Sequence, residues 1–207
     1  MQVDSIIFDL DGTLWDTCDS CAVAWNDVVT RHGIRFRPIV GDDVRGVAGK
    51  PHSDCIREVF HGLPHEQIDL LIRDTLVEDT RVISRLGGVL YPGVREGLAA
   101  LYGRLPLFIV SNCQRGYIET FYEVSGLGAL IRDQECWGNT GRPKTENIRA
   151  VVERNGLQRP IYVGDTLGDQ RAARDAGLPF AYAAYGFGKC TDFDLQLADF
   201  SEVLGLV

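Results

Sequence analysis

Lysine is scarce in this chain, and so are long hydrophobic runs. Of the 21 basic residues only three are lysines, and all three lie in segments that contain glycine or proline: Lys50, Lys144 and Lys189. Each lysine therefore calls for its own explanation in a chain whose other cations are arginines. No apolar run approaches membrane-spanning length, and no signal peptide precedes the first predicted strand, so we expect a cytoplasmic protein with no membrane partner.

Charge and cysteine content narrow the class of protein further. The net charge of -8 and the pI near 5.0 argue against a nucleic-acid partner, although a metal ion could still reverse the local field for a small anionic substrate. A chain of 207 residues does not need disulfides, so its six cysteines are read as free thiols. Cys18 and Cys21 lack a second C-x-x-C pair or histidines at zinc spacing, and we interpret them as ordinary helix residues.

The most informative segment lies near the N-terminus, at Phe8-Asp9-Leu10-Asp11-Gly12-Thr13-Leu14. The preceding run, residues 5–8, is apolar and β-branched, which predicts a buried strand. Two anions would not be tolerated inside an apolar sheet, so Asp9 and Asp11 belong at the strand's C-terminal end, where open α/β sheets bind ligands. Gly12 allows a sharp turn or a close approach of the backbone to a ligand. Two close carboxylates share a proton or a cation, and the alternative is an acidic turn without function.

Residues 16–87 read as a helical insertion. Between Trp15 and about Gly88 the pattern predicts no strand. Helices are expected over 17–32, around 42–47, and over 51–60 and 64–86, from capping residues, prolines at helix starts and apolar spacing. The predicted division is therefore a core of residues 1–15 and 88–207, and an all-helical domain of residues 16–87.

From Tyr91 onward helices and strands alternate. Helices are predicted over 94–103, 115–124, 145–155 and 168–176, and strands over 105–110, 161–163 and 180–184, with a short strand near 136–137. Alternation with fully apolar strands is typical of an α/β fold, in which a Rossmann-like parallel sheet is covered by helices on both faces.

Polar residues follow three of these strands. Ser111 and Asn112 come after one strand, Asp165 and Asp169 after another, and Lys144 lies in the loop before a helix. Because the carboxyl ends of parallel strands meet at one edge, we expect these groups to gather near Asp9 and Asp11. So many anions at close range need a cation, and oxygen ligands in small number favour Mg²⁺. Taken alone, Asp165 could be a helix N-cap and Asp169 a first-turn dipole partner.

These motifs, in this order, resemble the haloacid dehalogenase-like hydrolase superfamily, and the insertion after the first motif resembles the cap of its phosphoglycolate phosphatase and β-phosphoglucomutase-like branch. The resemblance covers nearly the whole chain. A second aspartate at position 11 is like the phosphatases of the superfamily, whereas Thr145 replaces the proline that commonly follows the motif lysine. The segments that carry the resemblance are Asp9-x-Asp11-Gly12-Thr13, Ser111, Lys144, Gly164-Asp165-x-x-x-Asp169 and Tyr91-Pro92-Gly93-Val94.

The resemblance implies a role for each motif residue. Asp9 would be the nucleophile and Asp11 the general acid and base. Mg²⁺ would be bound by Asp9, Asp165 and the backbone carbonyl of Asp11, while Asp169 would hold metal-bound water or orient Lys144. The groups expected to hold the phosphoryl oxygens are Gly12, Ser111, Asn112 and Lys144.

The implied function is Mg²⁺-dependent hydrolysis of a small-molecule phosphomonoester through an aspartyl-phosphate, by a monomer or homodimer. Two alternatives are a phosphoryl-transferring mutase of the β-phosphoglucomutase type and a non-catalytic binding protein on the same fold. In the resembling families the segment after the first cap helix reaches the leaving group of the substrate. Here that segment carries Arg45 and Lys50, which we expect to bind a second anion of the substrate.

Overall fold

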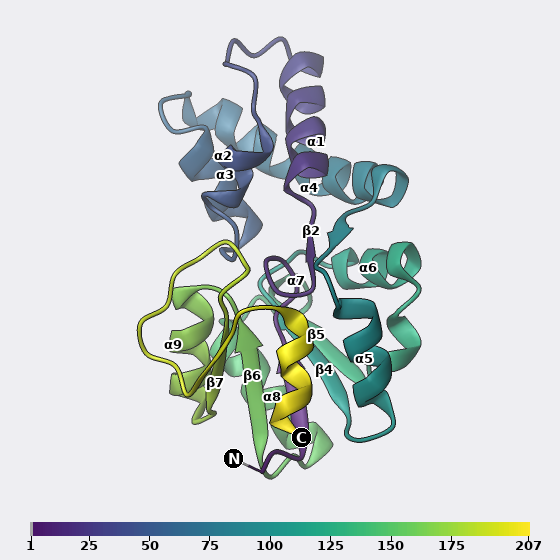
Figure 1. Cartoon of the computed structure of the whole chain (residues 1–207). Coiled ribbons are helices and arrows are strands. Elements are labelled where there is room, and N and C mark those ends of the chain that lie inside the picture. The colour runs from purple at the N-terminus through teal and green to yellow at the C-terminus, as the bar shows by residue number, and fades with distance from the viewer. Residues whose placement is uncertain (1) are drawn as a thin grey trace.

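The computed structural model describes residues 2–207, and its centre is a six-stranded sheet in which all neighbouring strands run parallel (Figure 1). The strand order is β5-β4-β1-β6-β7-β8. In chain order the strands are β1 (Ser5–Phe8), β4 (Leu107–Ser111), β5 (Asp133–Cys136), β6 (Pro160–Gly164), β7 (Phe180–Ala183) and β8 (Leu195–Leu197). The expected parallel α/β sheet is confirmed.

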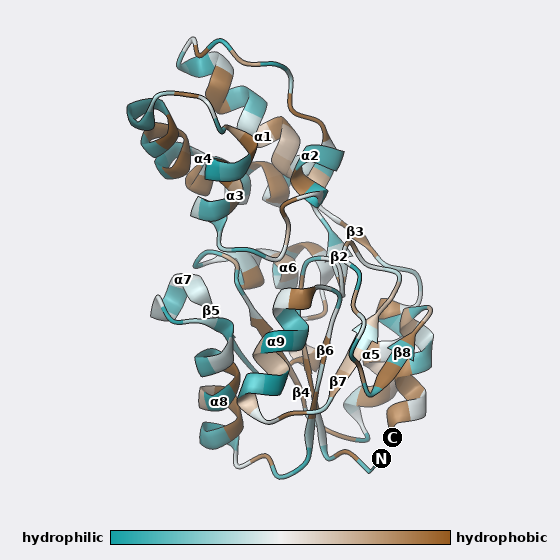
Figure 2. Ribbon diagram, turned by 90° about the vertical axis from the view of Figure 1, so that its left-hand side faces the viewer, coloured by the Kyte–Doolittle hydropathy of each residue, from teal (hydrophilic) through white to brown (hydrophobic). Residues whose placement is uncertain are grey.

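Helices cover both faces of the sheet, because successive side chains of a strand point in opposite directions. In β1, Ile6 and Phe8 pack into one hydrophobic cluster and Ile7 into another. The first cluster includes side chains of α5 (Val94–Tyr102), α6 (Tyr117–Ser125) and the 3-10 helix η2 (Phe200–Leu206). The second includes side chains of α8 (Lys144–Asn155) and α9 (Leu167–Ala176), whose outward faces are largely hydrophilic in Figure 2.

The helical insertion lies above the carboxyl edge of the sheet in Figure 1. It contains α1 (Cys18–Arg31), α2 (Gly41–Arg45), α3 (His52–Val59) and α4 (His65–Leu86). α1 packs against both α2 and α4, and α3 packs against α4. All four helices agree with the prediction to within a few residues, because capping residues and prolines mark their ends in the sequence.

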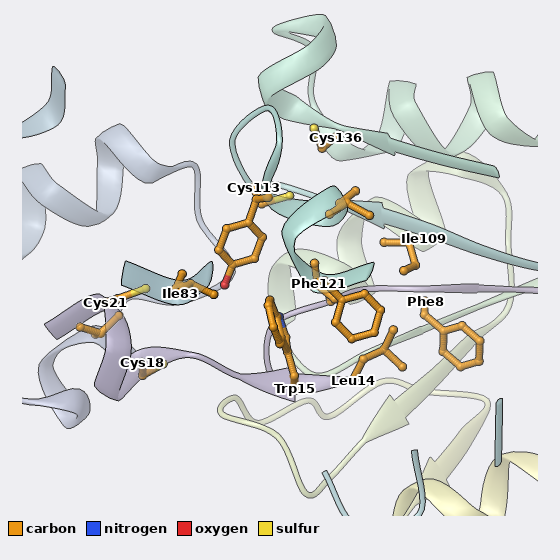
Figure 3. Close-up of a cluster of buried hydrophobic side chains, with 14 of the residues drawn as sticks. Phe8, Leu14, Trp15, Cys18, Cys21, Ile83, Ile109, Cys113, Phe121 and Cys136 are labelled. Atoms are coloured by element: carbon orange, nitrogen blue, oxygen red, sulfur yellow. The ribbon is translucent and has the colours of Figure 1, made fainter. Parts of the chain in front are cut away.

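The prediction that no strand occurs between Trp15 and Gly88 was wrong. Residues Trp15–Asp16 form β2, which pairs antiparallel with β3 (Val89–Leu90) where the chain enters and leaves the insertion. Two-residue strands are too short to leave a periodic pattern in the sequence. This pair forms only because the segment that enters the insertion and the segment that leaves it lie side by side. The Trp15 ring packs on Phe121 of α6 with centroids 5.0 Å apart (Figure 3).

Smaller differences concern element boundaries. The short strand expected at 136–137 ends at Cys136, and the next residues form a single helical turn, α7 (Trp137–Thr140). β8 and the 3-10 helix η1 (Gly128–Leu130) were not predicted. Lys144, expected in a loop, is the first residue of α8, because Pro143 caps that helix. Within residues 2–207, none of the helices has the length and hydropathy to cross a membrane.

Candidate active site

Asp9 lies immediately after β1 and is almost completely buried. Its backbone N–H donates to the carbonyl of Val163, 2.8 Å away, which fixes the residue at the sheet edge. One carboxylate oxygen, Oδ1, lies 3.0 Å from the ammonium of Lys144 but receives no hydrogen bond of good geometry. Burial and the nearby Asp169 raise the pKa of Asp9 to about 6, against the opposing effect of Lys144.

Lys144 and Asp169 form a buried ion pair beside Asp9. The Lys144 ammonium donates to Asp169 Oδ1 over 2.5 Å, and both side chains are buried. The other oxygen, Oδ2, accepts from the backbone N–H and the hydroxyl of Thr166 at the start of α9. Burial alone would lower the pKa of Lys144, but Asp169 and Asp9 raise it above its ordinary value. The lysine is therefore a fixed positive charge.

Asp165 completes a cluster of three buried carboxylates. Asp9, Asp165 and Asp169 each place one oxygen within 4.8 Å of the others. Burial, together with the charges of Asp169 and Asp9, raises the pKa of Asp165 well above its usual range. One lysine cannot balance three adjacent anions, so the cluster fits a divalent cation. Both oxygens of Asp169 accept hydrogen bonds, and Asp165 accepts from the backbone N–H of Phe187, whereas Asp9 Oδ1 contacts only the Lys144 ammonium. Asp9 therefore offers the oxygen that is most available to a cation.

The Asp11 carboxylate lies outside this cluster. Its Oδ1 accepts hydrogen bonds from the hydroxyl of Tyr117 over 2.7 Å and from that of Thr17 over 3.3 Å. Burial raises the pKa of Asp11 to about 7, although the Tyr117 hydrogen bond acts in the opposite direction. A carboxyl group that titrates near neutral pH is suited to both giving and taking a proton.

Gly12 is required by the close packing around Asp165. Its φ is +82°, a left-handed conformation that favours glycine, and a Cβ here would lie 2.3 Å from Asp165 Oδ2. Gly186 also packs closely here, because a Cβ on it would lie 2.3 Å from the carbonyl oxygen of Gly12 and 2.4 Å from the Cβ of Asp165. The loop after β1 and the loop after β7 thus enclose Asp165 with no room for a side chain.

Replacing Gly12 with alanine should therefore both destabilise the fold and impair the site. We expect the free energy of unfolding to fall by at least about 1–2 kcal/mol from the backbone conformation alone, with a further loss as Asp165 is displaced. Chemical denaturation measures the change. Gly103→Ala is the matched control, since its φ is −84° and an added Cβ meets nothing within 4 Å. Equal stability of the two variants would contradict this account of Gly12.

Ser111 and Asn112 follow β4, as the sequence predicts. Ser111 is the last residue of that strand and is buried. The Asn112 side-chain amide donates to the carbonyl of Gly49 over 2.9 Å, so this residue joins the core to the helical insertion. No local pattern in the sequence predicts that contact, because it joins residues 63 positions apart.

A cavity of about 80 Å³ lies between the core and the helical insertion. Asp9, Asp11 and Ser111 line it from the core, and Lys50 and His52 line it from the insertion. Asp165, Asp169 and Lys144 do not line it, but Lys144 and Asp169 contact or adjoin Asp9, which does. The small volume favours a substrate whose leaving group has only a few heavy atoms.

The structure separates the two cationic residues that the sequence grouped in the insertion loop. Lys50 lines the cavity and forms an ion pair with Glu58. Arg45 does not line it; its guanidinium donates to three carboxylates, one of them on β2 and one on α1: Asp16, Asp19 and Asp42. Arg45 therefore holds α2 to the start of the insertion, and three carboxylates compensate its charge there. That it binds substrate stays a prediction from the sequence.

Several cavity residues were missed by sequence reasoning. Tyr117, His52, Asp79 and Gln114 all line the cavity. All four stand in segments whose sequence pattern is that of an ordinary helix or loop. Their positions depend on how α4, α6 and the loop after β4 pack in three dimensions, which no local pattern reveals.

Comparison with known proteins agrees with this geometry. Residues 6–183 match the family model described as haloacid dehalogenase-like hydrolase. A phosphoglycolate phosphatase of Rhodobacter capsulatus is 30% identical over 218 residues, covering 98% of this chain and 96% of that protein. One of Synechococcus elongatus is 32% identical over 194 residues, covering 89% and 85%.

Solved structures share the fold. A protein of Haemophilus somnus described as a predicted phosphoglycolate phosphatase superposes with a TM-score of 0.87 at 20% identity, over 100% of this chain and 98% of that one. At this identity the likeness speaks for the fold alone. Together with the family match over most of the chain, it confirms the resemblance seen in the motifs, and the chain belongs to the haloacid dehalogenase-like hydrolase family.

Proposed function

We propose that this chain removes the phosphoryl group from a small phosphomonoester, with Asp9 as the nucleophile. The chain is a phosphoric monoester hydrolase of its family, since relatives matching nearly its whole length are phosphatases. No comparison favours the mutase alternative. Phosphoglycolate, the substrate named for those relatives, is the candidate we favour, because its two-carbon leaving group suits a cavity of about 80 Å³.

In the first half of the proposed reaction, an oxygen of Asp9 attacks phosphorus and the bond from phosphorus to the leaving oxygen breaks. Asp11, protonated near neutral pH, gives its proton to that oxygen. The products are the free alcohol and an aspartyl-phosphate on Asp9. Lys144 and the Ser111 hydroxyl stabilise the phosphoryl oxygens as their charge shifts in the transition state.

In the second half, Asp11 is ionised and takes a proton from water as that water attacks phosphorus. The bond to Asp9 breaks, inorganic phosphate leaves, and both carboxyl groups return to their starting states. Tyr117 and Thr17 hold the Asp11 carboxylate in one place through both steps. We propose that residues 16–87 act as a cap that excludes bulk water until the alcohol has left.

We propose Mg²⁺ as the metal, held by Asp9 and Asp165, with Asp169 orienting Lys144. When bound, Mg²⁺ neutralises charge on the transferring phosphoryl group and the carboxylates. The backbone carbonyl of Asp11 stays a predicted ligand.

One observation carries the proposal. Asp9, whose buried Oδ1 contacts only the Lys144 ammonium, lines the same cavity as Asp11, a carboxyl group whose pKa is raised by burial to about 7. A nucleophile and an acid-base group thus line one cavity. The test is to incubate the purified protein with Mg²⁺ and a panel of phosphorylated metabolites and to measure phosphate release. Hydrolysis of small esters, with phosphoglycolate among the best, is expected, and no release from any ester would contradict the proposal.

Lys50 should contribute modestly to binding. We expect Lys50→Ala to raise KM for phosphoglycolate by a few-fold, roughly, because the ammonium is half-exposed and already shared with Glu58. Its KM for p-nitrophenyl phosphate, whose leaving group carries no second anion, should change less. Steady-state kinetics measures KM for both substrates. Lys189→Ala, which removes an exposed lysine elsewhere, is the control. Equal changes in KM for both substrates would show that Lys50 does not bind a second anion of the substrate.

A further inference from the structure

We infer that His52 and Gln114 form a subsite that binds a carboxylate on the substrate's leaving group. The inference rests on the proposed phosphatase function. Both side chains are buried, both line the cavity that holds Asp9 and Asp11, and each keeps one buried nitrogen without a hydrogen-bond partner. Because unpaired buried polar atoms are costly, they suggest a ligand that pairs with them.

The contacts of His52 determine which ring nitrogen is free for a ligand. Its Nε2 lies 3.0 Å from the Thr75 hydroxyl oxygen and 3.4 Å from Asp79 Oδ2. The Thr75 hydroxyl donates its hydrogen to the carbonyl of Leu71 over 2.7 Å, so it accepts from Nε2. The hydrogen on Nε2 is therefore committed to Thr75 and Asp79, and Nδ1 is the atom without a partner.

Asp79 prepares His52 for an anionic ligand. Its carboxylate is buried, and its Oδ1 accepts from the indole N–H of Trp25 over 3.0 Å. The carboxylate is thus held in place on the Nε2 side of the ring. When Nδ1 also carries a proton, it becomes a donor, and Asp79 compensates for the positive charge of the ring. A carboxylate bound at Nδ1 would then complete a chain of alternating charges.

Gln114 supplies a second donor from the core. Its Nε2 is the unpaired atom, and the residue follows Cys113 in the loop after β4. An amide N–H donates whatever the charge of the ligand. His52 from the insertion and Gln114 from the core can therefore bind one acidic group together, and Lys50 adds positive charge on the same cavity wall. Such a carboxylate would bridge the core and the insertion.

The experiment compares two esters that differ only at the end of the leaving group. Phosphoglycolate ends in a carboxylate, and ethylene glycol monophosphate ends in a hydroxyl on the same two-carbon frame. We expect His52→Gln and Gln114→Leu each to lower kcat/KM for phosphoglycolate by about tenfold or more, as for a lost hydrogen bond to a charged group. For ethylene glycol monophosphate the loss should be roughly two- to threefold at most.

Two further variants separate recognition from packing. His52→Gln keeps a polar group near the position of Nε2, whereas His52→Asn keeps one near Nδ1, so the asparagine should retain more of the preference for the carboxylate. His65→Gln, an exposed histidine of the same insertion, should leave the preference unchanged. Thermal unfolding of each variant shows whether the insertion is intact, and Gln114→Leu provides a test that does not disturb the contacts of His52.

The outcomes are distinct. Equal losses for both esters in Gln114→Leu and His52→Gln, or a larger loss for the hydroxyl ester, would overturn the subsite. Wild-type protein that hydrolyses p-nitrophenyl phosphate but shows no preference for phosphoglycolate over ethylene glycol monophosphate would also overturn it, while leaving the proposed function in place. Wild-type protein that hydrolyses no phosphomonoester with Mg²⁺ present would instead overturn the proposed function.

Discussion

Replacing Asp9 with asparagine is expected to abolish phosphatase activity while leaving the fold intact. The substitution removes the attacking oxygen's charge but keeps the shape of a side chain that is almost completely buried. Burial already disfavours the charged form of Asp9, and Lys144 keeps its ion pair with Asp169, so little stability should be lost. We expect kcat to fall by about 10³-fold or more, as when a nucleophile is deleted in other enzymes.

Initial rates with p-nitrophenyl phosphate and circular dichroism on the same preparation test this prediction. Asp27→Asn makes the same chemical change at an exposed position of α1 and should behave as wild type. Residual activity of Asp9→Asn above a small percentage of the wild-type rate would show that the reaction does not proceed through a bond to Asp9.

Removing divalent cations should also abolish activity. The cluster of Asp9, Asp165 and Asp169 is buried, and a single lysine does not balance its charge. We expect excess EDTA to eliminate turnover, Mg²⁺ to restore it, and Ca²⁺ to restore it poorly, because its larger and looser shell disturbs the alignment of nucleophile and phosphorus. Full activity in EDTA would contradict the assignment of a metal site.

Stability gives a second readout of the metal that does not depend on turnover. A cation that binds only the folded state raises Tm, and the rise grows with its concentration. We expect Mg²⁺ to raise the Tm of the wild type and to have much less effect on Asp165→Asn. The control Asp175→Asn, at an exposed position of α9, should keep the full rise. An unchanged rise in Asp165→Asn would place the ion elsewhere.

The core of the site could be predicted because its residues follow strands. Apolar runs such as residues 5–8 identify parallel strands, and in a parallel sheet all carboxyl ends meet at one edge. The sequence therefore predicts that Asp9, Asp165 and Asp169 lie close together, although they span more than 150 positions of the chain.

The contacts between the core and the insertion could not be predicted in the same way. Tyr117 donates to Asp11 across 106 positions, and the pairing of His52 with Asp79 depends on how α3 packs against α4. Arg45 shows the limit most clearly. Its charge is visible in the sequence, but the three carboxylates that compensate for it come from β2, α1 and α2. A charged residue in the insertion therefore indicates a binding residue only once its partners are known.

The central claim is that a phosphoryl group is transferred to Asp9, and chemical trapping tests it most directly. The enzyme is quenched with acid during turnover and then treated with borohydride. Borohydride reduces an aspartyl-phosphate to homoserine, and mass spectrometry locates the homoserine in the peptide sequence. We predict homoserine at position 9 in the wild type with Mg²⁺ and substrate, and none when substrate is omitted. Homoserine at position 11 or 165, or at no aspartate position during active turnover, would contradict the mechanism.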